Sequence, residues 1–361
     1  MHFLPKLLAG ILAPMPITVW PTLANMVAAT LAGSISGMVY FLVRKSAHAA
    51  SLALALAMIP VAHSSLRMEA INSYANAYIP VAYLFSVVYL VRPIMGLINR
   101  LALCLITFVA VLTVPSVVLL IPLSMLVYRG YGVKLSKWIV STISASLATL
   151  IQLAVILQGS NERETGISQV AIESWIARVP ENLAATFLRD GSISNWLSEV
   201  SRLNTYRFAT VVLLTVVAAC LIALRSRELW RSSAALVIAG LTLSAMPSIL
   251  FFPISRYFVW FQILVYAGGI CCLTALVRSV PLRQVLLVLM ILPMFGGLVA
   301  HDFRASAEYR WSDSIRLAVS QCEVRGRTST PIFFAPDWPF VTAQDHLTEI
   351  TKNEVRCADL R

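Results

Sequence analysis

The positive charge of this 361-residue chain is concentrated in five short segments that separate long apolar runs. These segments hold twelve Lys and Arg residues and one acid, Glu228, so together they carry the formal net charge of +11. The rest of the chain holds 16 basic and 16 acidic residues. Because Lys and Arg concentrate in the short cytoplasmic loops of membrane proteins, the pattern predicts a polytopic membrane protein and its orientation. The segments are Arg44–Lys45, Arg92–Arg100, Arg129–Lys137, Arg225–Arg231 and Arg278–Arg283.

The composition excludes an ordinary soluble domain. Hydrophobic residues make up 58% of the chain and charged residues 12%, whereas soluble domains are about 25% charged. A pI of 9.7 is common among nucleic-acid-binding proteins, but here the basic residues flank apolar runs. We therefore predict contacts with anionic membrane lipids and no nucleic-acid partner. The sequence has neither a CxxC nor an HExxH motif, so no metal or other cofactor is predicted.

Eight apolar runs are candidate transmembrane helices, since about 20 residues cross a bilayer. A further run, 101–127, is too long for one helix and contains Pro115 and Pro122. If residues 101–127 crossed the membrane once, the later basic loops would face the outer side. If they form a hairpin that turns at Val114–Pro115–Ser116, every basic loop faces the cytoplasm. We predict an all-α polytopic membrane protein with about eight full transmembrane helices and one short helical hairpin. The eight runs are 23–43, 48–63 (the shortest), 74–91, 136–157, 207–224, 232–251, 258–277 and 283–300.

This orientation divides the chain into a transmembrane helical domain, residues 1–300, and a small extracytoplasmic C-terminal segment, residues 301–361. The C-terminal segment carries eight basic and nine acidic residues, a balance typical of a solvated surface. It also contains Cys322 and Cys357, which could form a disulfide in an oxidising compartment.

Four more segments lie on the outer side in this arrangement. In two of them, 1–20 and 158–206, apolar residues recur at helical spacing, which predicts amphipathic helices that rest on the membrane surface. The predicted spans contain two glutamines, Gln152 and Gln262. We expect each side chain to make a hydrogen bond to another helix rather than to contact a substrate. The four segments are 1–20, 64–73, 158–206 and 252–257.

Polar residues near the outer ends of the spans are the candidates for chemistry. Arg256, beside Tyr257, could bind a lipid phosphate or pyrophosphate through bidentate hydrogen bonds, or could serve only as an interfacial anchor. Glu69 could act as a general base on a sugar hydroxyl, or could be an ordinary solvated loop acid. Asn76, close to Glu69, and Asp190, in the long outer loop, are further candidates.

Short motifs along most of the chain match the layout of a known group. Glu69–Asn72 with Asn76–Tyr78 is similar to a Glu…Asn…Asn segment before that group's third span. Thr113–Ser116 with Ile121–Leu123 is similar to its paired short helices, and Ser255–Tyr257 to its outer Arg-Tyr step. The chain thus resembles bacterial GT-C-type glycosyltransferases, and more closely a poorly characterised, mostly actinobacterial group of such membrane proteins. The C-terminal match rests on Trp311, Cys322, Pro336, Trp338 and Cys357.

The resemblance implies a reaction, partners and a location. Enzymes of this type take a sugar from a polyprenyl-phosphate donor on the outer face of the bacterial cytoplasmic membrane, here for transfer to a cell-envelope glycan. Arg256 and Tyr257 would then bind the donor phosphate.

The chain departs from the family at the catalytic acid, which the family carries in its first outer loop. The first acid in this chain is Glu69, so no residue inherits that role by motif match. We expect either that the natural protein starts upstream with a further span, or that another acid such as Glu69 does the work, or that the protein is not an active transferase. A non-catalytic protein of envelope assembly and a lipid-linked sugar transporter or flippase are the alternative functions. Spans without central ionisable residues argue against an ion-driven transporter.

Overall fold

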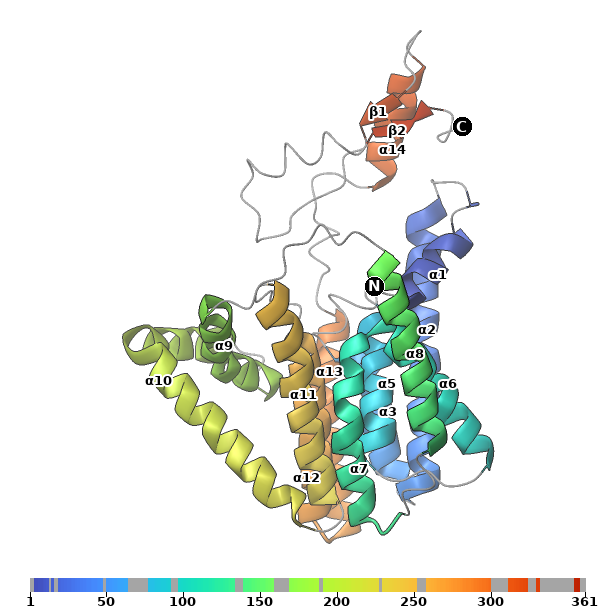
Figure 1. Cartoon of the computed structure of the whole chain (residues 1–361). Coiled ribbons are helices and arrows are strands. Elements are labelled where there is room, and N and C mark those ends of the chain that lie inside the picture. Colours follow the sequence, from blue (N-terminus) through green and yellow to red (C-terminus); the bar gives the residue numbers. More distant parts are fainter. Residues whose placement is uncertain are drawn as a thin grey trace. The chain divides into compact units, whose positions relative to one another are not determined.

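The structure, a computed structural model, is built almost entirely of α-helices in the part of the chain that it describes (Figure 1). Contacts divide the chain into two units. The first unit is Met1–Lys6 with Ala28–Leu298, and the second is Leu7–Val27 with Val299–Arg361. The described residues are 3–12, 14–15, 19–47, 50–63, 77–91, 97–133, 139–158, 169–187, 191–226, 229–251, 258–299, 311–323, 329–331 and 354–357.

The first unit consists of helices rich in Ala, Leu and Val. A helix satisfies the backbone hydrogen bonds of an apolar segment internally, which is required where water is excluded. Helices α1, α2 and α13 have residues in both units. The helices are α1 (Phe3–Leu12), α2 (Trp20–Ala47), α3 (Ala50–Ala62), α5 (Tyr78–Leu90), α6 (Leu97–Thr113), the 3-10 helix η4 (Pro115–Leu119), α7 (Leu120–Gly130), α8 (Ile139–Gln158), α9 (Gln169–Phe187), α10 (Gly191–Leu224), α11 (Leu229–Phe251), α12 (Phe258–Leu276) and α13 (Val280–Val299).

Four helices in the described part of the chain are long and apolar enough to cross a membrane. The spanning segments are Asn25–Arg44 of α2, Arg207–Leu224 of α10, Leu229–Ile249 of α11 and Phe258–Leu276 of α12. All four coincide with runs that the sequence predicts as spans. Six further apolar helices are shorter, 10–17 residues each over the residues searched. Over the residues that the structure describes, the chain is therefore a helical protein with four candidate membrane-spanning helices.

The core of the first unit is centred on α5, α11 and α12. Every residue of α5 is buried. Helices α11 and α12 pack closely because glycines replace side chains at their contact: a Cβ on Gly240 would lie 3.2 Å from the Phe261 Cα, and one on Gly268 would lie 3.0 Å from the Ser233 carbonyl oxygen. Small residues of this kind let the backbones of membrane helices approach. The pairing of Gly240 with Phe261 and of Gly268 with Ser233 also shows that α11 and α12 run antiparallel.

Residues 101–127 form two helices joined by a 3-10 turn, at the place that the sequence predicts. Helix α6 ends at Thr113, and Pro115 begins η4, which leads into α7. The hydroxyl of Tyr131, directly after α7, donates to the carbonyl of Val91, directly after α5 (3.4 Å). The chain therefore returns after α7 to the end of the bundle at which α5 finishes.

Both glutamines of the spans make hydrogen bonds between helices, as predicted. The side-chain amide of Gln152 in α8 donates to the carbonyl of Leu112 in α6. In α12, Gln262 Nε2 donates to Asn182 Oδ1 of α9 at 2.9 Å.

Helix α9, in the 158–206 loop, packs its apolar face against other helices. Its Trp175 and Val179 are buried in a cluster with residues of α11 and α12, including Leu241 and Phe261. The indole N–H of Trp175 also donates to Ser244 Oγ of α11 at 3.3 Å. The same apolar face that predicts an interfacial helix is therefore used to pack against two helices of the bundle.

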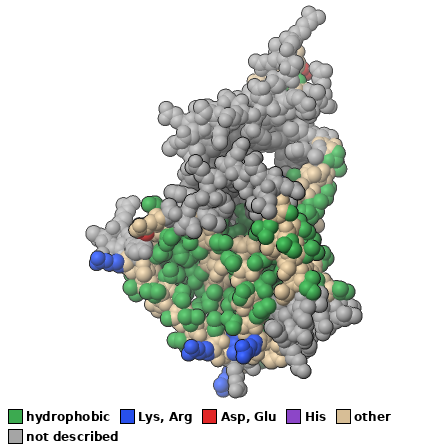
Figure 2. Space-filling view, viewed as in Figure 1, with side chains coloured by type: hydrophobic (Ala, Val, Ile, Leu, Met, Phe, Trp, Pro, Cys, Tyr) green, Lys and Arg blue, Asp and Glu red, His purple; other side chains and the backbone are tan. Residues whose placement is uncertain are grey.

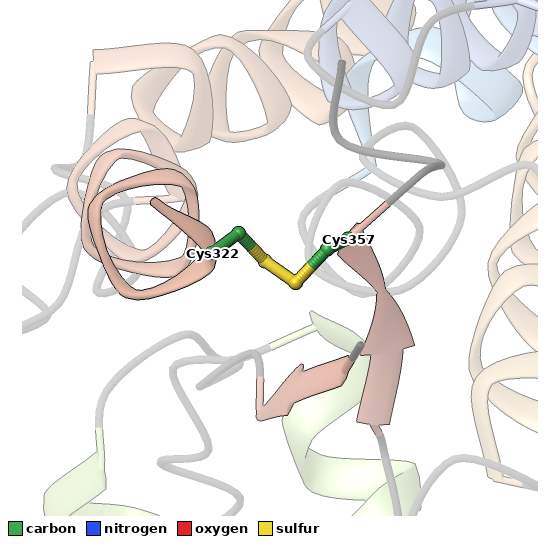
Figure 3. The surroundings of a disulfide bond; sticks show 2 residues. All are labelled: Cys322 and Cys357. Atoms are coloured by element: carbon green, nitrogen blue, oxygen red, sulfur yellow. A yellow bond between two sulfur atoms is a disulfide. The ribbon is translucent and has the colours of Figure 1, made fainter. Parts of the chain in front are cut away.

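The second unit contains a small disulfide-linked motif. Helix α14 (Trp311–Cys322) is followed by the antiparallel strands β1 (Ser329–Pro331) and β2 (Glu354–Arg356), which pair Ser329 with Arg356. A disulfide between Cys322 and Cys357 joins the end of α14 to the residue after β2, as Figure 3 shows, so the predicted pair is bonded. Closing a loop of this length, 35 residues, stabilises a folded segment by about 4 kcal/mol in the chain-entropy account.

Candidate functional site

The candidate residues Glu69, Asn76, Asp190, Arg256 and Tyr257 lie outside the described residues. The structure does describe the helix ends from which their segments leave. These flanking residues show which parts of the chain come together.

The segment with Asn76 and the segment with Arg256 both lead into aromatic residues that contact each other. Tyr78 begins α5 two residues after Asn76, and Trp260 lies in the first turn of α12. Their ring centroids are 5.5 Å apart with an interplanar angle of 71°, an edge-to-face contact. Both side chains are buried. The starts of α5 and α12, which are about 180 residues apart in the sequence, are therefore neighbours.

The last described residue before the Glu69 segment is His63, which lies farther along α12 than the Trp260 contact. His63 follows the short helix α3, and its backbone N–H still donates to the Ile59 carbonyl (3.1 Å). Its imidazole is 4% exposed and packs against the ring of Tyr266 at 5.3 Å between centroids. Tyr266 is six residues beyond Trp260, or about 9 Å along the axis of α12. The end of α3 therefore lies farther from the start of α12 than the start of α5 does.

The end of α9 meets the same side of α12. Phe187, three residues before Asp190, stacks on Tyr266 with ring centroids 5.7 Å apart. A Cβ on Gly269 would lie 3.1 Å from the Phe187 ring, so a larger residue at position 269 would push this ring away. The Tyr266 hydroxyl donates to the Met290 carbonyl of α13.

Helix α12 thus contacts residues next to each predicted segment. Trp260 faces the start of α5, while Gln262, Tyr266 and Gly269 follow 3–4 spacing and share one helix face. That face contacts α9, and its Tyr266 also contacts His63. His63 and Tyr266 were not predicted from the sequence. Polar and aromatic residues at helical spacing within an apolar span are the pattern that would have indicated them.

The opposite end of the bundle holds the basic segments. Ser232 Oγ and the Tyr131 hydroxyl both donate to the Val91 carbonyl, which joins the start of α11 to the ends of α5 and α7. Since α12 runs antiparallel to α11, it ends there too, and the segment Arg278–Arg283 follows. Four of the five basic segments therefore adjoin one end of the bundle. Figure 2 shows a group of Lys and Arg side chains at the lower end of the drawn face, below a broad hydrophobic surface.

Among the residues that the structure describes, no group of three or more His, Cys, Asp and Glu could hold a metal ion.

Comparison with protein-family models, with curated proteins and with solved structures finds no match to this chain. The class that the structure defines is the helical protein with candidate membrane spans.

Proposed function

We propose that this chain is a membrane glycosyltransferase-like protein that transfers a sugar from a polyprenyl-phosphate donor to a cell-envelope glycan. The proposal is supported chiefly by the contact between Tyr78 and Trp260, because it joins the flanks of the two motifs that resemble a GT-C-type site. One motif contributes Glu69 and Asn76, and the other contributes Arg256 and Tyr257. A shared site for these motifs requires their flanking helices to be neighbours, and they are.

The proposed topology has eight full transmembrane helices and the hairpin α6–η4–α7, with the basic segments in the cytoplasm. The membrane is the bacterial cytoplasmic membrane, and the C-terminal segment is extracytoplasmic. The convergence of four basic segments at one end of the bundle supports this orientation. The proposed site then lies on the outer side, where Tyr78 and Trp260 meet.

Cysteine labelling tests the orientation. Ser226→Cys, at the basic end, and Gln169→Cys, at the start of α9, are compared in intact cells with a membrane-impermeant maleimide, after the four free cysteines have been replaced by Ala. We expect Gln169→Cys to react and Ser226→Cys to be protected until the membrane is permeabilised. The reverse pattern would show that the proposed orientation is wrong.

In the proposed reaction a carboxylate, for which Glu69 is the candidate, takes the proton of an acceptor hydroxyl. The hydroxyl oxygen attacks the anomeric carbon of the donor sugar, and the bond from that carbon to the phosphate oxygen breaks with inversion. Arg256 stabilises the negative charge that develops on the leaving phosphate, and Tyr257 contributes to phosphate binding.

The test is sugar transfer by the purified full chain from a radiolabelled polyprenyl-phosphate sugar to an envelope glycan extract. Glu69→Gln and Arg256→Gln should each lower the rate at least 100-fold, since general-base and charge-stabilising groups contribute about 10²–10⁴-fold. Arg207→Gln, an exposed Arg of α10, is the matched control and should leave the rate unchanged. Binding of the donor without transfer by the unaltered chain would favour the non-catalytic alternative, and transfer that survives both substitutions would exclude these residues.

A further inference from the structure

Arg231 holds a fixed position at the basic end of the bundle. Its Nε donates to the carbonyl of Leu224, the last residue of α10, at 2.8 Å. Its guanidinium lies over Gly130, the last residue of α7, where a Cβ would be 1.3 Å from Nη1. The C-terminal ends of helices carry partial negative charge. Arg231 is therefore a cation held between two helix ends.

Two exposed arginines are next in sequence to the residues that this cation contacts. Arg129 precedes Gly130, and Arg225 follows Leu224, so each adjoins a residue that Arg231 contacts. Both side chains are exposed. The sequences of α7, α11 and residues 207–224 contain no Asp or Glu, and Glu228, the one acid of the adjoining segment, lies outside the described residues. Three arginines carried by neighbouring helix ends, with so little negative charge in the sequence around them, favour binding of an anion.

The surface next to this cluster is apolar. Leu221 and Ile222, in the last turn of α10, are 55% and 73% exposed. Only 11% of the apolar segment of α10 is buried. A ligand that contacts both surfaces must combine an anionic group with hydrocarbon, which distinguishes a phospholipid from a soluble phosphate.

We propose that Arg129, Arg225 and Arg231 form a binding site for the phosphodiester of an anionic phospholipid. The exposed Arg129 and Arg225 contact the phosphate oxygens, while Arg231 supplies a fixed charge beneath them. The acyl chains of the lipid lie along Leu221 and Ile222. This site is at the opposite end of the bundle from the proposed transferase site and does not depend on it.

The test titrates phosphatidylglycerol into the full chain in neutral detergent and follows the midpoint of thermal unfolding. Phosphatidylcholine and inorganic phosphate serve as separate titrants. We expect phosphatidylglycerol to raise the midpoint with saturation, and the other two to have little effect. The double variant Arg129→Gln/Arg225→Gln should bind roughly 30-fold more weakly, because each of the two cations near anionic lipid strengthens binding about fivefold.

Two further variants separate lipid binding from loss of structure. Arg129→Lys/Arg225→Lys keeps the charge and should retain most of the effect. Arg207→Gln removes an exposed Arg about 26 Å along α10 from Leu224 and should bind as the unaltered chain does. Equal stabilisation by phosphatidylcholine or by inorganic phosphate would overturn the proposal, as would undiminished binding by a folded Gln variant. If the Gln variant does not fold, a Lys variant that folds and has lost the preference for phosphatidylglycerol would also overturn it.

Discussion

Helices α10 and α12 are both long and apolar enough to cross a membrane, yet they have opposite roles in the bundle. In α12, 67% of the apolar segment is buried, against 11% in α10. Helix α12 packs against α3, α5, α9 and α11. In residues 207–224 of α10, by contrast, several large apolar side chains are exposed, namely Phe208, Val211, Leu214, Leu221 and Ile222. Apolar composition therefore indicates that a helix can lie in a membrane, but it does not say whether its neighbours are protein or lipid.

The two helices differ in the residues that allow a neighbouring helix, instead of lipid, to pack against them. Helix α12 has Gly268 and Gly269, where a neighbouring helix approaches closely, and Gln262 and Tyr266, which hydrogen-bond to other helices. Residues 207–224 contain neither glycine nor an amide side chain. Because lipid tails are as apolar as Leu, helix association in a membrane depends on close packing and hydrogen bonds rather than on apolarity.

The largest contrast is expected for leucine truncation in the two helices. Leu264 of α12 is 0% exposed and Leu214 of α10 is 61% exposed. Leu264→Ala should lower the free energy of unfolding by about 3 kcal/mol, because the cavity it leaves cannot be filled. Leu214→Ala should change it by less than about 0.5 kcal/mol. Unfolding in mixed micelles measures both, and equal losses would show that the two helices are not distinguished by packing.

A smaller contrast is expected for glycine. Gly268→Leu places a side chain against the Ser233 carbonyl and Val237, and should cost about 2 kcal/mol through overpacking. The matched control is Gly33→Leu in α2, where a Cβ has nothing within 4 Å and the change in stability should be below about 0.5 kcal/mol. Similar thermal midpoints for the two variants would contradict the close approach of α11 and α12.

The smallest effect is expected for the hydrogen bond that joins α9 to α12. A double-mutant cycle of Gln262→Leu and Asn182→Leu should give a coupling energy of about 0.6 kcal/mol, the usual value for polar pairs between membrane helices. The observable is again the free energy of unfolding in mixed micelles. Strictly additive losses would mean that the two side chains do not interact in the folded protein.

The features that could be predicted from the sequence are those determined by residues within a single segment. Pro115 interrupts an apolar run and fixes a turn, whichever helices surround it. The disulfide of Cys322 and Cys357 was predicted because both cysteines lie in one polar segment. The packing of α9 against α11 and α12 was not predicted, because an apolar stripe such as the one that includes Trp175 and Val179 can face lipid or a neighbouring helix.

The sequence by itself determined that this chain forms apolar helices and that short basic segments separate them, since hydropathy and charge are local properties of the chain. Only the tertiary structure placed Tyr78 against Trp260, His63 against Tyr266, and Arg231 between the ends of α7 and α10. Each of these contacts joins residues far apart in the sequence. They depend on which helices pack together and at what depth, and this is decided by the fit of side chains between elements rather than by the pattern within any one of them.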